Sequence, residues 1–272
     1  MTFASRILWV ASLLAMCMVC AGLSAGERAA PPDAETVEMF AAMDQGQIEV
    51  KLIPKDSSLC NILVENKTDK PLTVKLPDAF AGVPVLAQPG LGGMGGGGLG
   101  GGGLGGGGGY GGGGGGQAMG GGMGGMGGMG GMGGGMMGGG GFMNVAPEQV
   151  SKFKVTTVCL EHGKPEPRAA MQYKIVPVDQ FTEKKEVYEL CRMLGYGKMP
   201  QRVAQAAAWA LSNDMSWQEL AGKQIIRANG VRYPYFSPAE IHAAMNVAAA
   251  AMKTAKEQAD KSSAESNSLS QN

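Results

Sequence analysis

The chain has 272 residues, among them 47 glycines and 20 methionines, and its 23 basic residues balance 23 acidic residues. Because no basic stripe alternates with aromatic residues, the electrostatic footprint of a nucleic-acid-binding protein is missing, and we expect no nucleic-acid partner. Only two histidines are present, His162 and His242, and no CxxC pair follows the N-terminal segment, so we expect neither a zinc site nor any other cofactor.

Residues 1–25 have the pattern of a secretory signal peptide. Arg6 precedes an apolar run of about 14 residues, and small residues follow at Ala21 and Ala25, either of which can end the signal. The run is shorter than the roughly 20 residues that span a bilayer, so we expect no transmembrane anchor once the signal is cleaved. The mature protein is therefore expected to be secreted, or to lie in the periplasm or cell envelope.

Three cysteines remain after cleavage, namely Cys60, Cys159 and Cys191. Export would permit a disulfide, but three is an odd number, so at least one thiol stays unpaired. The sequence leaves the pairing open, and each cysteine also suits a buried apolar position.

Residues 26–46 are expected to form a polar N-terminal leader, with a short helix near 35–43. Beyond it the apolar residues recur with a period of two, as in half-buried strands, and turn residues separate the runs. About seven strands are predicted, at residues 47–52, 59–65, 72–76, 83–86, 142–145, 150–160 and 173–178.

Between these strands lies a segment of almost pure glycine with scattered Met and Leu, residues 89–141. Neither flank alone has enough strands for a stable sheet with a buried face. We therefore predict one immunoglobulin-like β-sandwich over residues 47–178, interrupted by a long disordered Gly/Met-rich loop. Two separate domains joined by the tract remain the alternative. The thioethers could bind a soft metal, but Gly-Gly spacers would leave them unordered, so a flexible surface segment is the simpler interpretation.

The pattern changes to helix in the last third of the chain, which makes the predicted class α+β. A small helical bundle is expected over residues 179–260, followed by a disordered tail at 261–272. Capping signals begin two of its helices at Ser216 and Ser237, and Asn229-Gly230 is expected to end the first of these.

Two short motifs suggest chemistry. Val158-Cys159-Leu160 ends a predicted strand, and a helix carries Gln205 four residues before Trp209. The pair resembles the hydrophobic-Cys and hydrophobic-Gln-x-x-hydrophobic-Trp motifs of bacterial thioester-domain adhesins. That resemblance implies an internal thioester between Cys159 and Gln205 that captures amines on a target surface. The plain alternative is a buried Cys and a solvent-facing Gln.

A second resemblance covers most of the mature chain. The segments LVENKTDKPLTVKLP, VTTVCLEHGKP and QAAAWALSNDMSWQEL are similar to an uncharacterised group of secreted planctomycete-type proteins that carry a Gly-rich insert. It implies export and the same architecture, without an activity. We expect a non-catalytic cell-envelope or surface interaction protein whose partners are surface polymers or proteins, with thioester attachment as the alternative.

Overall fold

The computed structural model describes residues 34–85, 116–125 and 141–269, with side chains to Ala264. The predicted signal peptide and most of the predicted Gly/Met insertion lie outside these ranges. Among the described helices, none is both long enough and apolar enough to cross a membrane.

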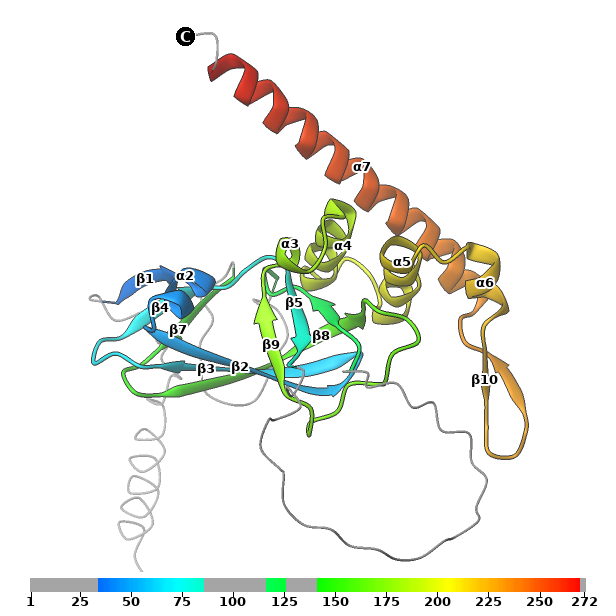
Figure 1. Cartoon of the computed structure of the whole chain (residues 1–272), viewed down its shortest axis with the longest axis horizontal. Coiled ribbons are helices and arrows are strands. Elements are labelled where there is room, and N and C mark those ends of the chain that lie inside the picture. Colours follow the sequence, from blue (N-terminus) through cyan, green and yellow to red (C-terminus); the bar gives the residue numbers. More distant parts are fainter. Residues whose placement is uncertain (1–33, 86–115, 126–140, 270–272) are drawn as a thin grey trace, which may run out of the picture.

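Six antiparallel strands form a closed barrel in the order β2-β3-β8-β6-β5-β9 (Figure 1). The α+β class is confirmed, but the immunoglobulin-like sandwich is wrong, because the strands curve into a barrel instead of two facing sheets. The barrel strands are β2 (Ile48–Asp56), β3 (Leu59–Asn66), β5 (Phe80–Pro84), β6 (Met119–Gly121), β8 (Val150–Cys159) and β9 (Tyr173–Val176).

A separate three-stranded sheet lies beside the barrel, in the order β1-β4-β7. It consists of β1 (Glu35–Glu38), β4 (Leu72–Lys75) and β7 (Phe142–Val145), and β1 runs directly into the short helix α2 (Met39–Asp44). Met39 and Ala42 of that helix are buried in the core. The second half of the predicted leader therefore belongs to the folded body.

The largest departure from the sequence prediction lies inside the glycine tract. Residues 116–125 are ordered, and β6 pairs with β5 on one side and β8 on the other, which closes the barrel. Met119 and Met123 are fully buried there. The tract was predicted as one disordered loop because glycine is depleted in strands, and for this decapeptide that prediction is wrong.

Glycine is required in this segment because helix α4 (Lys185–Gly195) packs directly on its backbone. A Cβ added to Gly122 would lie 2.5 Å from the carbonyl oxygen of Cys191 and slightly closer to that of Asp78. Gly195, at the end of α4, faces Gly122 in turn. Two glycines thus allow a helix and a strand end to approach each other without side chains between them.

The remaining helices are α3 (Val178–Phe181), α5 (Gln201–Asn213), α6 (Trp217–Gly222) and α7 (Pro238–Leu269). Helix α7 continues through residues predicted to be a disordered tail. Helix α6 is shorter than predicted, because a hairpin of β10 (Gln224–Ile226) and β11 (Arg232–Pro234) follows it. Asn229-Gly230 lies in the connection between these two strands, residues 227–231, which is the role this dipeptide favours, and it does not end a helix.

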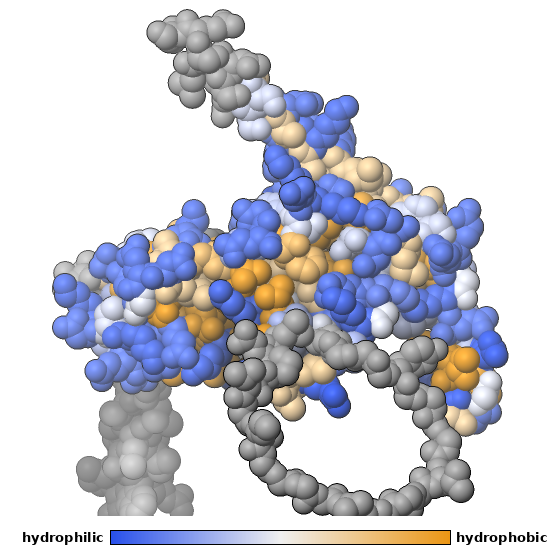
Figure 2. All heavy atoms as spheres, in the orientation of Figure 1, coloured by the Kyte–Doolittle hydropathy of each residue, from blue (hydrophilic) through white to orange (hydrophobic). Residues whose placement is uncertain are grey.

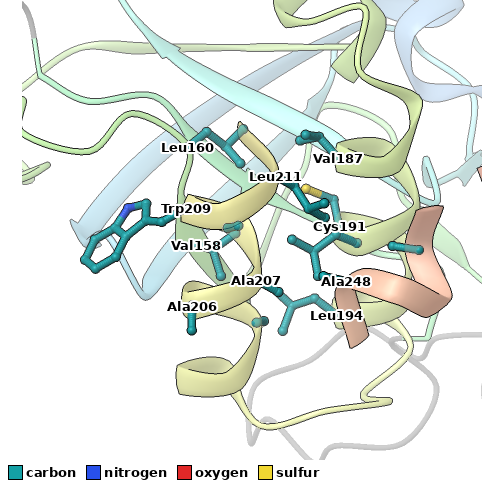
Figure 3. Close-up of a cluster of buried hydrophobic side chains, with 14 of the residues drawn as sticks. Val158, Leu160, Val187, Cys191, Leu194, Ala206, Ala207, Trp209, Leu211 and Ala248 are labelled. Carbon is teal, nitrogen blue, oxygen red and sulfur yellow. The ribbon is translucent and has the colours of Figure 1, made fainter. Parts of the chain in front are cut away.

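Where the barrel wall lies under the helices, at β5, β6, β9 and the end of β8, alternate residues face two different cores. Phe80, Met119 and Ile175 belong to the core that fills the barrel. Their sequence neighbours Ala81, Ala118 and Val176 belong to a second core, between the barrel wall and the helices. Figure 3 shows part of this second core, with Val158 and Leu160 of the wall region near Cys191 of α4 and Leu211 of α5. The helices are therefore part of one body with the barrel.

We predict that Gly122→Ala destabilises the protein by about 2–4 kcal/mol, because the new methyl group meets backbone atoms that cannot rotate away. The matched control is Gly222→Ala at the end of α6, where a Cβ would have no neighbour within 4 Å. The control should stay within about 1 kcal/mol of the parent. Urea unfolding measures both, and equal stability of the two variants would contradict the packing of β6 on α4.

Candidate functional site

The predicted site residues lie at the end of strand β8, which extends beyond the end of its neighbour β3. The pairing of β8 with β3 ends at Thr156, and one further bond joins the Thr157 N–H to the Ser58 carbonyl oxygen. Beyond that point the same edge of β8 faces helix α5. Gln201, one helical turn before Gln205, donates from its Nε2 to the carbonyl oxygen of Thr157 at 3.1 Å. Side chains of α5 thus bond the backbone of β8 at the positions that β3 no longer pairs with.

Gln205 makes the central contact between α5 and β8. Its Oε1 accepts the backbone N–H of Cys159 at 2.8 Å, and its Nε2 donates to the backbone oxygen of Cys159 at 3.0 Å. Both partners are buried. The structure therefore places the side chain of Gln205 against the backbone of Cys159. The carboxamide bonds this backbone and not the thiol.

The thiol of Cys159 instead faces a third residue, Gln117, which comes from the ordered part of the glycine tract. The Cys159 Sγ donates to the Gln117 Oε1 at 2.5 Å, and the Gln117 Nε2 donates to a carboxylate oxygen of Glu166 at 2.9 Å. Tyr173 donates its hydroxyl to the backbone oxygen of Gln117 at 2.7 Å. Burial raises the pKa of the Cys159 thiol to about 11, so the thiol is protonated at neutral pH.

Trp209 links this buried cluster to the surface. Its indole is largely buried, and its Nε1 has no hydrogen-bond partner among the described residues. The ring packs edge-on against His162 at 4.8 Å and against Phe236 at 5.7 Å between centroids. Lys223 lies 5.2 Å from the indole centroid, and its Nζ is 2.7 Å from the Nε2 of His162. Burial and the charge of Lys223 lower the pKa of His162.

The β10–β11 hairpin, residues 224–234, projects from this aromatic region. It extends away from the barrel and helices, below α6 in Figure 1. Every residue of its two strands is exposed, including Ile225, Ile226 and Tyr233. Figure 2 shows apolar surface at this position beside hydrophilic residues. It is a second candidate site, of the binding type.

A pocket of about 740 Å³ lies elsewhere, between the β4–β5 connection and the start of the helical region. Its lining has acidic residues such as Asp78 and Asp179 together with Lys75 and Lys184, but neither cysteine nor histidine. Within the described residues, no three His, Cys, Asp or Glu side chains are grouped so that they could hold a metal ion. The pocket therefore offers no nucleophile comparable with Cys159.

The chain matches no protein-family model, no curated protein and no solved structure. The two resemblances noted from the sequence therefore stay predictions.

Sequence reasoning found Cys159 and Gln205 but missed Gln117, Glu166 and the hairpin. Gln117 is the one polar residue of the decapeptide Gly116–Gly125. A single polar residue in an otherwise apolar and glycine-rich segment was the signal that could have marked it as a site residue. For the hairpin the signal was Asn229-Gly230 between Ile225-Ile226 and the segment Val231–Tyr235, which is rich in Val and Tyr.

We predict that Gln205→Ala lowers the free energy of unfolding by about 2–4 kcal/mol, because it leaves a buried N–H and a buried carbonyl of Cys159 without partners. Gln201→Ala is the matched control on the same helix. It removes one bond from a half-buried position and should cost about 1 kcal/mol. Denaturant unfolding measures the free energy of unfolding of both variants. A decrease for Gln205→Ala that is equal to or smaller than that for Gln201→Ala would contradict its role on the edge of β8.

Proposed function

We propose that this chain is an exported, non-catalytic protein of the cell envelope or surface, which acts by binding. The N-terminal sequence supports export. The observation that carries the binding role is the projecting hairpin, where Ile225, Ile226 and Tyr233 are 42%, 60% and 45% exposed. Apolar side chains gathered on one projecting element indicate an interaction site.

The environment of Cys159 supports binding over catalysis. Its thiol is buried, is bonded to Gln117, and has a pKa raised to about 11 by burial. Because the thiolate is the nucleophile, a buried and protonated thiol is poorly reactive. Gln205 and Gln201 hold the backbone of β8, which is a structural role.

Export is tested with a fusion of residues 1–33 to a phosphatase that is active only outside the cytoplasm. The fusion should be active, and Leu13→Arg, which places a charge in the apolar run, should abolish that activity. Purified mature protein should then sediment with isolated envelope fragments. An inactive parent fusion, or mature protein that stays in the supernatant, would contradict the proposed function.

Covalent attachment through a thioester is the second candidate, and the grouping of one thiol with two carboxamides favours it. In this step the Cys159 sulfur would bond to the carboxamide carbon of a glutamine. The carbon–nitrogen bond would break, and ammonia would leave with the thiol proton. An amine on a target would later displace the thiol and form an amide. Gln205 is the donor that the motif resemblance implies, and Gln117 is the glutamine that faces the thiol.

The intact mass of the mature protein tests this second candidate. A thioester would lower the mass by one ammonia relative to the sequence, and methylamine would add its own mass to the product. Only two of the three mature cysteines would then react with a thiol reagent in denaturant before amine treatment. Gln117→Ala and Gln205→Ala identify the donor, because only the loss of the true donor restores the full mass. A parent mass equal to that of the sequence, with three reactive thiols, rejects the thioester.

A further inference from the structure

We propose that the β10–β11 hairpin binds peripherally to an anionic lipid bilayer, with its apolar side chains inserted at the level of the headgroups and the first acyl carbons. The inference rests on the proposed function, because it names the partner of the same projecting element. It is carried by three observations: apolar residues on both faces, arginines without an acidic partner among the described residues, and a hydrogen-bonded and packed attachment to the body.

Apolar residues occupy both faces of the hairpin. Ile225 is opposite Tyr233 in the strand register, whereas the next residue, Ile226, is opposite Arg232. Because successive side chains of a strand point to opposite faces, Ile225 and Tyr233 share one face and Ile226 lies on the other. A flat protein partner would cover one face and leave the other in water. A bilayer interface surrounds an inserted hairpin, so it covers both.

The charge of the hairpin complements a lipid phosphate layer. Between Glu219 and Glu240 the only charged residues are Lys223, Arg227 and Arg232. Arg227 lies 5.0 Å from the ring centroid of Tyr233, and Arg232 donates to the Gln224 side chain at 3.4 Å. Neither arginine forms an ion pair with a residue in the part of the chain that the structure describes. Both guanidinium groups therefore remain available to phosphate, which they match in geometry.

The side-chain types also match the depth that each would occupy. Isoleucine is stable in the acyl region, while tyrosine and arginine favour the headgroup level, where an apolar body meets a polar tip. An acidic polymer in water would use the arginines alone and leave the two isoleucines exposed. The combination of apolar insertion and basic charge is typical of peripheral binding to anionic membranes.

The hairpin is attached to the body at its base. The Tyr235 N–H bonds the carbonyl oxygen of Lys223 at 2.7 Å, which closes the hairpin. Tyr235 and Phe236 then pack against Trp209, and the ammonium group of Lys223 lies over the rings of both Trp209 and Tyr235. This base fixes the direction of the hairpin, so that its tip points away from the barrel (Figure 1).

Sedimentation of the mature protein with lipid vesicles tests the inference. We expect binding to vesicles that contain phosphatidylglycerol, weak binding to pure phosphatidylcholine, and loss of binding as salt is raised. Replacing both arginines, Arg227→Gln with Arg232→Gln, should weaken the partition about 30-fold, since each basic residue near an anionic surface contributes about 1 kcal/mol, a factor of roughly five. Ile225→Ser with Ile226→Ser should weaken it on the order of tenfold or more.

Two control variants change the same properties elsewhere. Lys152→Gln with Lys154→Gln removes two exposed charges from β8, and Met252→Ser removes a 56% exposed apolar side chain from α7. Both should bind vesicles as the parent does. Tyr233→Trp supplies a direct readout, because its fluorescence should shift to the blue only with anionic vesicles. All variants alter exposed positions, and thermal melts should confirm that they remain folded.

No binding to anionic vesicles, or equal binding by the hairpin variants and the controls, would overturn the inference. A dimer in lipid-free solution that the same hairpin variants abolish would also overturn it, since the hairpin would then bind a second copy of the chain. The proposed function is judged separately, by sedimentation with envelope fragments. Protein that binds these fragments but ignores vesicles would retain its function and lose the lipid partner.

Discussion

The closure of the barrel by Met119–Gly121 is the constraint on which the other features depend. This short strand supplies the last pairings of the barrel, with β5 and β8. It places Met119 in the barrel core and Ala118 in the core beneath the helices. It also carries Gln117 to the thiol of Cys159. Because β6 consists largely of glycine and is followed by Gly122, α4 can pack directly on its backbone. The glycine tract therefore contains one of the most tightly packed segments of the described structure.

The body and the hairpin differ in how their polar and charged side chains are paired. In the body, polar side chains serve the backbone: Gln201 and Gln205 extend the ladder of β8, and Gln117 connects the Cys159 thiol to Glu166. Buried polar groups stabilise a fold only when they are paired, and the carboxamides of Gln117 and Gln205 are. In the hairpin the apolar side chains are exposed. Its two arginines contact only the Tyr233 ring and the Gln224 side chain, and neither forms an ion pair with a described residue. This difference between the two regions supports the proposed binding role.

The sequence predicted much of this fold because its signals are local. Alternating apolar residues indicate one buried face, and an observed strand overlaps each of the seven predicted ranges, although the one predicted at 83–86 is Phe80–Pro84. The motif pair pointed to Cys159 and Gln205, which are in contact, but the thioester that it implies stays a prediction. Barrel closure could not be predicted, because it depends on Gly120 and Gly121, which have no side chains and so show no alternating apolar pattern. Gln117 was missed for the same reason. The hairpin was missed because Ile225 also fits a helical spacing, which was preferred over the Asn229-Gly230 turn signal.

Amide hydrogen exchange at Met119, Gly120 and Gly121 tests the central claim most directly. Selective isotope labelling of methionine, glycine and valine makes these amides and that of Val158 observable by NMR. A strand paired on both sides should exchange as slowly as the neighbouring amide of Val158 in β8, through opening of the whole barrel. Exchange of the three amides at the rate of an unstructured peptide, while Val158 stays protected, would contradict the account, because the barrel would then be open at this position.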